Sequence, residues 1–174
     1  MSRAASWTVR STERPERSDV GEPPARSIRA VLDTNVLVRG LTRATGPSRE
    51  ILEALVDERA FRLVTSAEIL AELGDVLQRP AFRRHVEFSD FEIMRAIRGL
   101  RGVAQMVPGT YFELDAVPTD PDDNPVVACA LEGGAECLVT DDRRDLLPLK
   151  VIRMSGYRPV QVMTPRGFLR LLGL

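Results

Sequence analysis

The feature that most constrains the fold is an alternation of short apolar runs with longer segments that carry apolar residues at helical spacing. The runs are rich in aliphatic residues and bounded by polar or turn-forming residues, which is typical of buried strands; they lie at 28–32, 61–65 and 136–140. The segments between them show the apolar stripes of amphipathic helices. Strands that alternate with helices predict a parallel sheet covered on both faces, which is an α/β fold.

Capping residues set the expected bounds of the helices. Ser66 is a natural N-cap for the helix after the second run. Gly133 and Gly134 end a helix whose first residue is Pro125, with Asn124 as its N-cap. The predicted helices lie at 47–58, 67–78, 81–86, 90–102, 125–132 and 166–171, with further short strands at 103–107, 151–152 and 160–162 and a loop at 40–47.

Composition divides the chain into an extension and one domain. Residues 1–27 are rich in Arg, Ser, Glu and Pro and carry almost no aliphatic side chains, so they cannot bury enough apolar surface to fold. Residues 28–174 suffice for one domain with a sizeable core, which should be aliphatic because the chain is 44% hydrophobic but only 5% aromatic. We therefore expect a disordered N-terminal extension at 1–27 and a folded domain at 28–174.

The net charge and the rarest residue types exclude several classes of function. A formal charge of −1 argues against capture of nucleic acid by the whole molecule, although it leaves room for a local basic rim. Cys129 and Cys137 cannot form a disulfide framework or a zinc site, and we expect both to be buried as small hydrophobic residues. His85 is the only histidine, and nothing near it supports a serine-type triad. No apolar run resembles a signal peptide or a membrane span, so the expected protein is soluble and cytoplasmic, with no membrane partner.

Acidic residues recur where predicted strands end and predicted helices begin. Asp33 and Asp142 each follow an apolar strand, and Asp123 precedes a predicted helix. Glu72 lies at the rim of a helical apolar stripe, between core and surface. Because strand exits share one edge of a parallel sheet, these four carboxylates can converge on one cleft. Two simpler interpretations stay open, namely Asp33 as part of a strand-end turn and Glu72 as a solvated helical residue.

Convergence of the four acids has a chemical consequence. Four carboxylates cannot all be ionised in a dry pocket, because like charges raise one another's pKa. A divalent cation removes that conflict, and ligation by oxygen alone, with no histidine or cysteine, indicates Mg²⁺ or Mn²⁺. Such sites keep positions open for water and phosphate oxygens, which suits metal-assisted phosphodiester hydrolysis.

Four sequence motifs together resemble those of one nuclease family. Each motif is weak alone, and their order and intervals carry the resemblance; they are LDTNVL (32–37), SAEILAEL (66–73), DPDDN (120–124) and VTDDRRDLL (139–147). With them the chain resembles the PIN-domain nucleases and, more narrowly, the toxin components of bacterial toxin–antitoxin pairs. The resemblance extends from about residue 28 to the C-terminus and leaves the N-terminal extension outside.

The resemblance implies a fold, an activity and a set of site residues. The implied fold is a three-layer α/β/α domain with a central, mainly parallel sheet, and the implied activity is that of a metal-dependent endoribonuclease. The four acids of the family fall on Asp33, Glu72, Asp123 and Asp142. Of these, Asp33, Asp123 and Asp142 would hold Mg²⁺ or Mn²⁺, directly or through water. Glu72 would complete the set and help to orient the attacking water.

Four further positions refine or question that assignment. Asn35 and Thr140 match polar positions that support the acids in the family. Asp141 stands where relatives usually carry glycine, so it adds negative charge beside the last acid. Asp122 adjoins Asp123 and leaves the third acid ambiguous by one residue.

The resemblance also implies a substrate and partners. Single-stranded or looped RNA would be the substrate, and an antitoxin protein or a second copy of the chain would be the partner. One alternative is a non-catalytic PIN module that binds RNA or a protein. A phosphatase of the haloacid dehalogenase type is a weaker alternative, because that family needs an aspartate where Asn35 stands.

Overall fold

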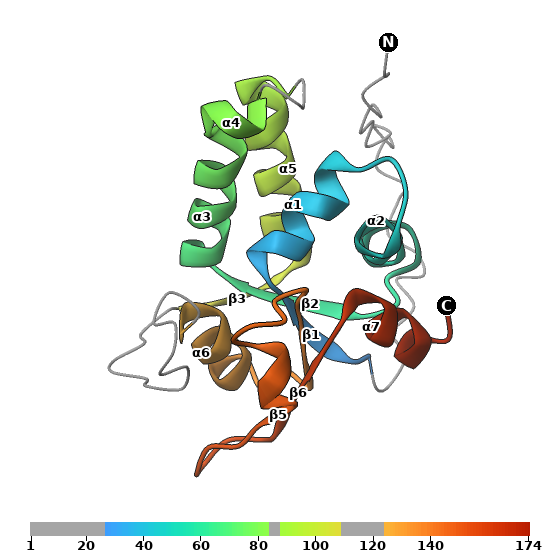
Figure 1. Ribbon diagram of the computed structural model, residues 1–174, viewed down its shortest axis with the longest axis vertical. Helices are drawn as coiled ribbons and strands as arrows, with labels where there is room; N and C mark the ends of the chain where they lie inside the picture. The colour runs from blue at the N-terminus through green and yellow to red at the C-terminus, as the bar shows by residue number, and fades with distance from the viewer. Residues whose placement is uncertain (1–26, 84–87, 109–123) are drawn as a thin grey trace, which may run out of the picture.

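The computed structural model describes residues 27–83, 88–108 and 124–174. Within them, six strands form one sheet at the centre of the domain (Figure 1). The predicted extension, apart from Ser27, and the third predicted acid, Asp123, lie outside the described residues. The strands are β1 (Arg29–Leu32), β2 (Arg62–Ser66), β3 (Gln105–Val107), β4 (Cys137–Val139), β5 (Val151–Ile152) and β6 (Val160–Met163).

The sheet is parallel except at one edge, as the sequence predicts. Its strand order is β3-β2-β1-β4-β6-β5, and β5 pairs antiparallel with β6. β1 lies between β2 and β4, with Leu32 opposite Val139. The next residues, Asp33 and Thr140, therefore leave the sheet side by side, and the Asp33 amide donates a hydrogen bond to the Val139 carbonyl oxygen at 3.0 Å.

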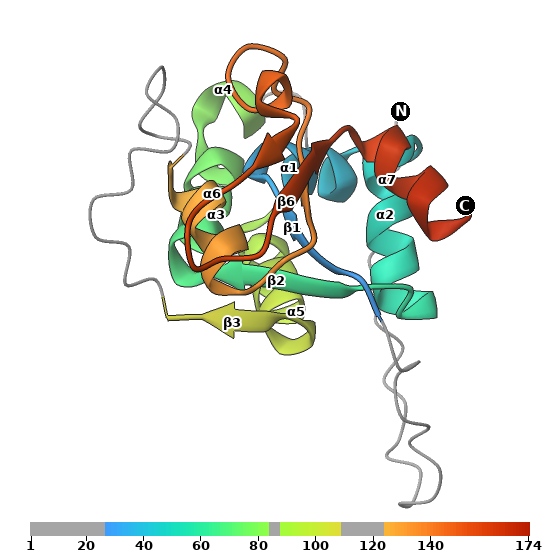
Figure 2. The ribbon, with the colours of Figure 1, turned by 90° about the horizontal axis from the view of Figure 1, so that it is seen from below.

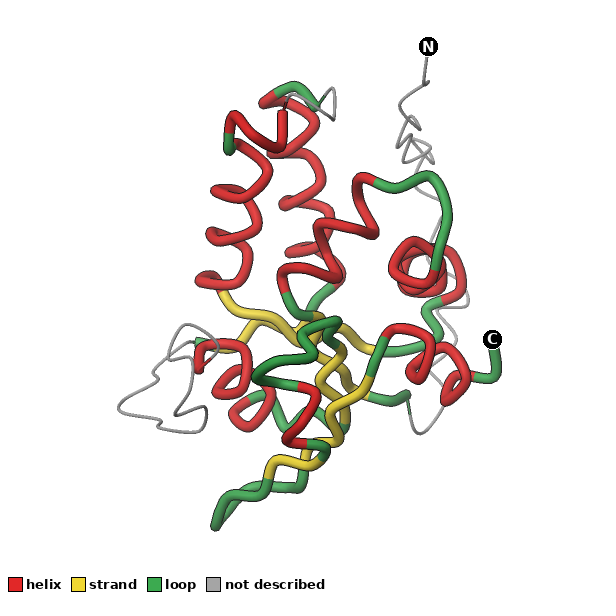
Figure 3. The backbone as a smooth tube through the Cα atoms, viewed as in Figure 1, coloured by secondary structure: helices red, strands yellow, loops and turns green. Residues whose placement is uncertain are grey.

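Helices cover both faces of the sheet. Figure 1 shows α6 on one face and α1 and α3 on the other, and the tube in Figure 3 shows the same layers. α2 and α7 lie beside each other at one end of the domain (Figure 2). This arrangement confirms the α/β/α prediction. The helices are α1 (Thr34–Thr42), α2 (Pro47–Glu53) with a π-helical continuation (Ala54–Glu58), α3 (Ala67–Gln78), α4 (Pro80–Arg83), α5 (Asp90–Val103), α6 (Asn124–Glu132) and α7 (Pro165–Leu172), and a short 3₁₀ helix spans Leu147–Leu149.

The core between these layers is aliphatic, as the composition predicts. Cys129 and Cys137 are both buried in it as free thiols, which confirms their expected role as small hydrophobic residues. One aromatic pair joins α7 to the start of β2, where the rings of Phe61 and Phe168 meet edge to face with centroids 5.0 Å apart. Within the described residues, no helix combines the length and the apolar character needed to cross a bilayer.

Local capping explains where several predicted helices begin and end. The Ser66 hydroxyl accepts a backbone hydrogen bond in the first turn of α3, and Ser89 and Glu92 form a reciprocal capping box at α5. Gly134, with a φ of +59°, takes the left-handed conformation that ends α6. α6 begins at Asn124, one residue earlier than predicted.

The predicted loop at 40–47 is wrong for residues 40–42, which belong to α1, a helix that the sequence pattern does not predict. Three consecutive buried residues, Val36 to Val38, conceal the helical spacing, because α1 packs against both α2 and α3. Gly40 permits the close approach of α1 and α2, since a Cβ atom at this position would lie 2.6 Å from the Ser48 carbonyl oxygen. α1 therefore begins directly after Asp33 and is held in place by α2 and α3.

Candidate active site

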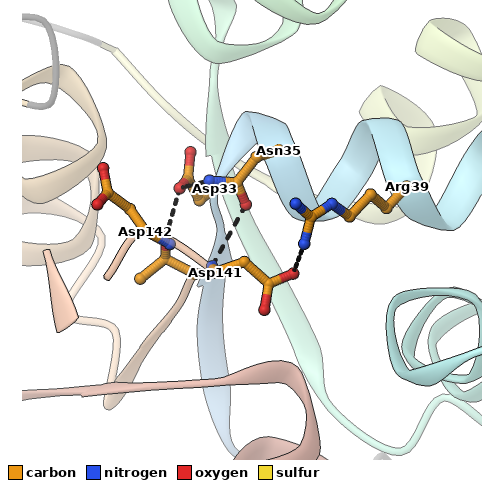
Figure 4. Close-up of polar contacts among 6 residues, drawn as sticks. Asp33, Asn35, Arg39, Asp141 and Asp142 are labelled. Atoms are coloured by element: carbon orange, nitrogen blue, oxygen red, sulfur yellow. Dashed lines mark hydrogen bonds and ion pairs between the residues drawn. The ribbon is translucent and has the colours of Figure 1, made fainter. Parts of the chain in front are cut away.

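Asp33 lies at the centre of a hydrogen-bonded group where β1 and β4 end. It is the residue between β1 and α1, in extended conformation. Its Oδ2 atom accepts hydrogen bonds from the Thr140 hydroxyl at 2.5 Å and from the Asn35 side-chain amide at 2.6 Å. The carboxylate is therefore held by one residue after β4 and one residue of α1. Figure 4 shows Asp33 and Asn35 beside Asp141 and Asp142.

Burial makes the ionised form of Asp33 costly. Only 6% of the residue is exposed, and desolvation raises the pKa of its carboxyl group above the ordinary value. The hydrogen bond from Thr140 offsets part of this rise, whereas the neighbouring negative charge of Glu72 adds to it. A cation bound between these two acids would stabilise the ionised form of Asp33 and offset the negative charge of Glu72.

Glu72 reaches this group from α3, in agreement with its predicted position at the rim of the helical stripe. Its Oε2 atom accepts a hydrogen bond from the Thr34 hydroxyl at 2.6 Å. Thr34 is the first residue of α1 and follows Asp33 directly. Its hydroxyl therefore holds the Glu72 carboxylate close to Asp33. Glu72 itself is exposed, which leaves its carboxylate accessible from solvent.

Asp142 is fixed by the backbone of its own loop. Its amide donates a hydrogen bond to the Thr140 hydroxyl oxygen at 2.9 Å, so Thr140 contacts both Asp33 and Asp142. The Asp142 Oδ1 atom accepts hydrogen bonds from the amides of Arg144 at 2.6 Å and Asp145 at 3.0 Å. Thr140 therefore links the first predicted acid to the fourth across two neighbouring strands.

Asp141 points away from this group. Its amide donates to the Asn35 Oδ1 atom at 3.4 Å, while its carboxylate forms an ion pair with Arg39 of α1. Figure 4 shows the Asp141 side chain directed toward Arg39 and the Asp142 side chain directed away from it. The extra negative charge expected from Asp141 is thus compensated by an arginine.

The structure links three of the four predicted acids, Asp33, Glu72 and Asp142, through neighbouring threonines. In the described ranges, no three acidic, histidine or cysteine side chains form a group that could already hold a metal ion. Asp123 lies outside these ranges, although the helix that it precedes begins at Asn124 as described. The metal-binding roles of the acids therefore stay predictions.

Two residues of the site, Thr34 and Arg39, are not singled out by the sequence analysis. Both lie on α1, the helix that the pattern of apolar residues conceals. Asn35 and Arg39 are four residues apart, a spacing that places both on one helix face, and both contact Asp141. If α1 had been predicted as a helix, the spacing of four residues would have identified Asn35 and Arg39 as neighbours.

Comparisons with known proteins find a matching family model, a similar protein and a similar solved structure. The family model described as PIN domain matches residues 29–144. An uncharacterized protein of Methanocaldococcus jannaschii is 29% identical over 147 residues, which cover 82% of this chain and 90% of that protein. A solved structure, VapBC2 from Rickettsia felis bound to a DNA fragment from their promoter, gives a TM-score of 0.47 at 16% identity and covers 66% of this chain and 88% of that chain.

Proposed function

The chain belongs to the PIN-domain family, whose members are generally nucleases, and we propose that it is an endoribonuclease that requires Mg²⁺ or Mn²⁺. The observation that carries this proposal is the state of Asp33. Its carboxyl group is buried, receives two side-chain hydrogen bonds and lies near Glu72, so its charge is costly unless a cation is bound. Single-stranded or looped RNA is the proposed substrate.

The donor set suits a hard divalent cation, because it consists of carboxylate oxygens without histidine or cysteine. In this proposal Asp33, Asp142 and Asp123 hold the cation. When bound, it would polarise the scissile phosphate and lower the pKa of a coordinated water. Glu72, held by Thr34, accepts a proton from the attacking water or orients it.

Thr140 and Asn35 position the acids in this scheme. Thr140 donates to the Asp33 carboxylate and accepts from the Asp142 amide, so it holds the backbone of one acid against the carboxylate of the other. Asn35 donates to Asp33 and accepts from the Asp141 amide, which fixes the same carboxylate from α1. Residues that support metal ligands in this way commonly change metal affinity or activity by about 10- to 100-fold when they are replaced.

We further propose that the chain acts in the cytoplasm as the toxin of a toxin–antitoxin pair. The four sequence motifs support this proposal. An antitoxin would block the site with an arginine, because a guanidinium group pairs bidentately with a carboxylate and can take the place of a cation. A structure of the complex in which the inhibitor leaves Asp33 and Asp142 open to solvent would contradict this part of the proposal.

A cleavage assay on a mixed RNA pool tests the activity. We expect cleavage with Mg²⁺ or Mn²⁺, none with EDTA, and a loss of more than about 100-fold for Asp33→Asn, which removes the buried charge. The melting temperature should rise with Mn²⁺ in the wild-type protein and not in Asp33→Asn. Retained RNA binding with no cleavage under any divalent metal would instead support the non-catalytic alternative.

A further inference from the structure

We call the hydrogen-bonded acids Asp33, Glu72 and Asp142, with Thr34 and Thr140, the acid group. A basic pocket of about 330 Å³ lies on the far side of Asp141 from this group. The pocket lies between the end of α1, the loop into α2, the loop after β4 and the start of α7. Its volume is at the lower end of the roughly 300–1,000 Å³ typical of ligand sites. We call this the arginine pocket, because its charged lining consists of Asp141 and four arginines, Arg39, Arg43, Arg143 and Arg166.

Most of the positive charge in the arginine pocket is uncompensated. Arg39 pairs with Asp141, and among the described residues Arg43, Arg143 and Arg166 form no ion pair. All four arginines are exposed, so their guanidinium groups are available to a ligand from solvent. A chain with a formal charge of −1 thus concentrates positive charge beside the acid group.

Threonines and a glycine also line the pocket. Thr45 and Thr164 contribute hydroxyl groups, and Gly46, with a φ of +114°, turns the chain into α2 without placing a side chain in the opening. The combination of planar guanidinium groups with hydroxyl donors matches the oxygens of a phosphate group, which arginine binds with paired hydrogen bonds.

We propose that the arginine pocket binds one backbone phosphate of the RNA strand whose scissile bond lies at the acid group. This inference rests on the proposed nuclease function and adds to it a second contact that fixes the strand. The two sites are joined by a short series of contacts, from Asp33 to Asn35, from Asn35 to Asp141 and from Asp141 to Arg39. A strand that enters the acid group therefore passes directly beside the arginines.

Asp141 has a distinct role in this proposal, since it is the one carboxylate in the charged lining of the pocket. It holds Arg39 in place and also competes with an incoming phosphate for that guanidinium group. Removal of its charge should therefore strengthen phosphate binding in the pocket, the opposite of the effect expected at a metal ligand. Asp141 is a positioning residue here.

The test is binding of a short fluorescein-labelled single-stranded RNA, measured by fluorescence anisotropy in EDTA so that neither metal nor cleavage is needed. We expect Arg43→Ala/Arg166→Ala to weaken binding by ~10- to 100-fold, the usual size for lost hydrogen bonds to a charged group. The slope of log K against log salt should become less negative by about 0.7 for the one phosphate lost. Asp141→Asn should bind more tightly than the wild-type protein.

The matched control is Arg158→Ala, an exposed arginine in the segment between β5 and β6, away from the pocket lining. It should leave both affinity and salt slope unchanged. Arg166→Ala alone serves if the double variant does not fold, and its affinity loss should be smaller but in the same direction. Wild-type affinity in the pocket variants, equal weakening in Arg158→Ala, or no RNA binding by the wild-type protein would each overturn the proposal.

A parallel cleavage assay with Mn²⁺ separates this inference from the proposed function. Loss of binding in the pocket variants without any wild-type cleavage would refute the nuclease and retain the phosphate site. Wild-type cleavage that the pocket variants reproduce at limiting RNA would refute the phosphate site and retain the nuclease. Displacement of the labelled RNA by an acidic peptide at lower concentrations than by unlabelled RNA would assign the pocket to a protein partner and also overturn the proposal.

Discussion

The acid group and the arginine pocket meet at Asp141 but are built in opposite ways. In the acid group, Asp33 and Thr140 are buried, leave adjacent strands and hold one another through a hydrogen bond of 2.5 Å. In the arginine pocket, the four arginines are exposed, and of these Arg39 alone has a described ion-pair partner, Asp141. The first site is preorganised by the sheet, whereas the second can adjust to its ligand.

From this contrast we expect the two sites to affect different steps, catalysis and RNA binding. Metal chemistry needs carboxylates held in fixed positions, and residues at strand ends provide them because the pairing of β1 with β4 sets their separation. Binding of a flexible RNA strand requires positive charge and long side chains more than a rigid arrangement. Arginine side chains supply both the charge and the length. Variants in the acid group should therefore change the rate of cleavage, while those in the pocket should change affinity.

The largest effect that the comparison predicts concerns the third acid. Asp123→Asn should lower metal-dependent cleavage by more than about 100-fold, since it removes a proposed metal ligand. Asp122→Asn should cost little activity, and about 1 kcal/mol of stability at most. The measurement is cleavage rate against Mn²⁺ concentration, with circular dichroism to verify folding. An inactive Asp122→Asn beside an active Asp123→Asn would shift the assignment by one residue.

Thr140→Val should have the next largest effect, because it keeps the shape of the side chain but removes the hydroxyl that joins Asp33 to Asp142. We expect Mn²⁺ affinity or cleavage rate to fall by about 10- to 100-fold, the range typical of residues that support metal ligands. Stability should fall by about 1–3 kcal/mol, since a buried carboxyl group loses a donor. Thr140→Ser retains the hydroxyl and should restore most of the activity, whereas an inactive Thr140→Ser would show that the methyl group matters instead.

The same contrast explains how much the sequence predicts. Much of the acid group follows from local patterns, because an apolar run followed by acids marks Asp33 and the pair Asp141 and Asp142, and parallel pairing then places these residues at one edge. The choice of Asp142 over Asp141 depends on the resemblance to the PIN-domain family. The arginine pocket has no such pattern. Its arginines come from α1, two loops and α7, and only the packing of α2 against α7 and of α1 against α2 brings them together. The site residues Thr34 and Arg39 escape prediction for a related reason, since burial on most sides removes the periodicity that reveals α1.

The pH dependence of stability should distinguish the buried acid from exposed ones. The pKa of Asp33 is raised above 3.8 in the folded protein, so this protein binds a proton that the unfolded chain releases. The stability that Asp33 contributes is therefore full below pH 3.8 and is lost as the pH rises through the folded pKa. In EDTA, Asp33→Asn should remove this loss and melt at a higher temperature than the wild-type protein at neutral pH. The pKa of Glu92 is lowered by hydrogen bonds from Ser89, so its effect on the pH dependence of stability has the opposite sign. Both proteins contain Glu92, and its contribution therefore cancels in the difference between their melting temperatures.

Melting curves in EDTA and in Mn²⁺ at several pH values provide this measurement. Mn²⁺ should reverse the order of the two proteins at neutral pH, because the cation stabilises only the chain that keeps the Asp33 carboxylate. Equal melting temperatures at every pH in EDTA would show that Asp33 is solvated in solution and would weaken the contrast between a buried acid group and an exposed pocket.

The smallest expected effect is that of removing the N-terminal extension, which we propose to be separate from the domain at 28–174. The truncated chain should begin at Ser27, because the Ile28 carbonyl oxygen accepts a hydrogen bond from the Arg62 amide at 2.8 Å and belongs to the fold. The removed segment 1–26 carries five arginines and four acidic residues, so its net charge adds little to the field of the arginine pocket. Both the melting temperature and the salt slope of RNA binding should therefore match those of the full chain. A salt slope that becomes less negative on truncation would show that the arginine pocket shares the strand with the extension, and a melting temperature lower by several degrees would show that the extension packs on the domain.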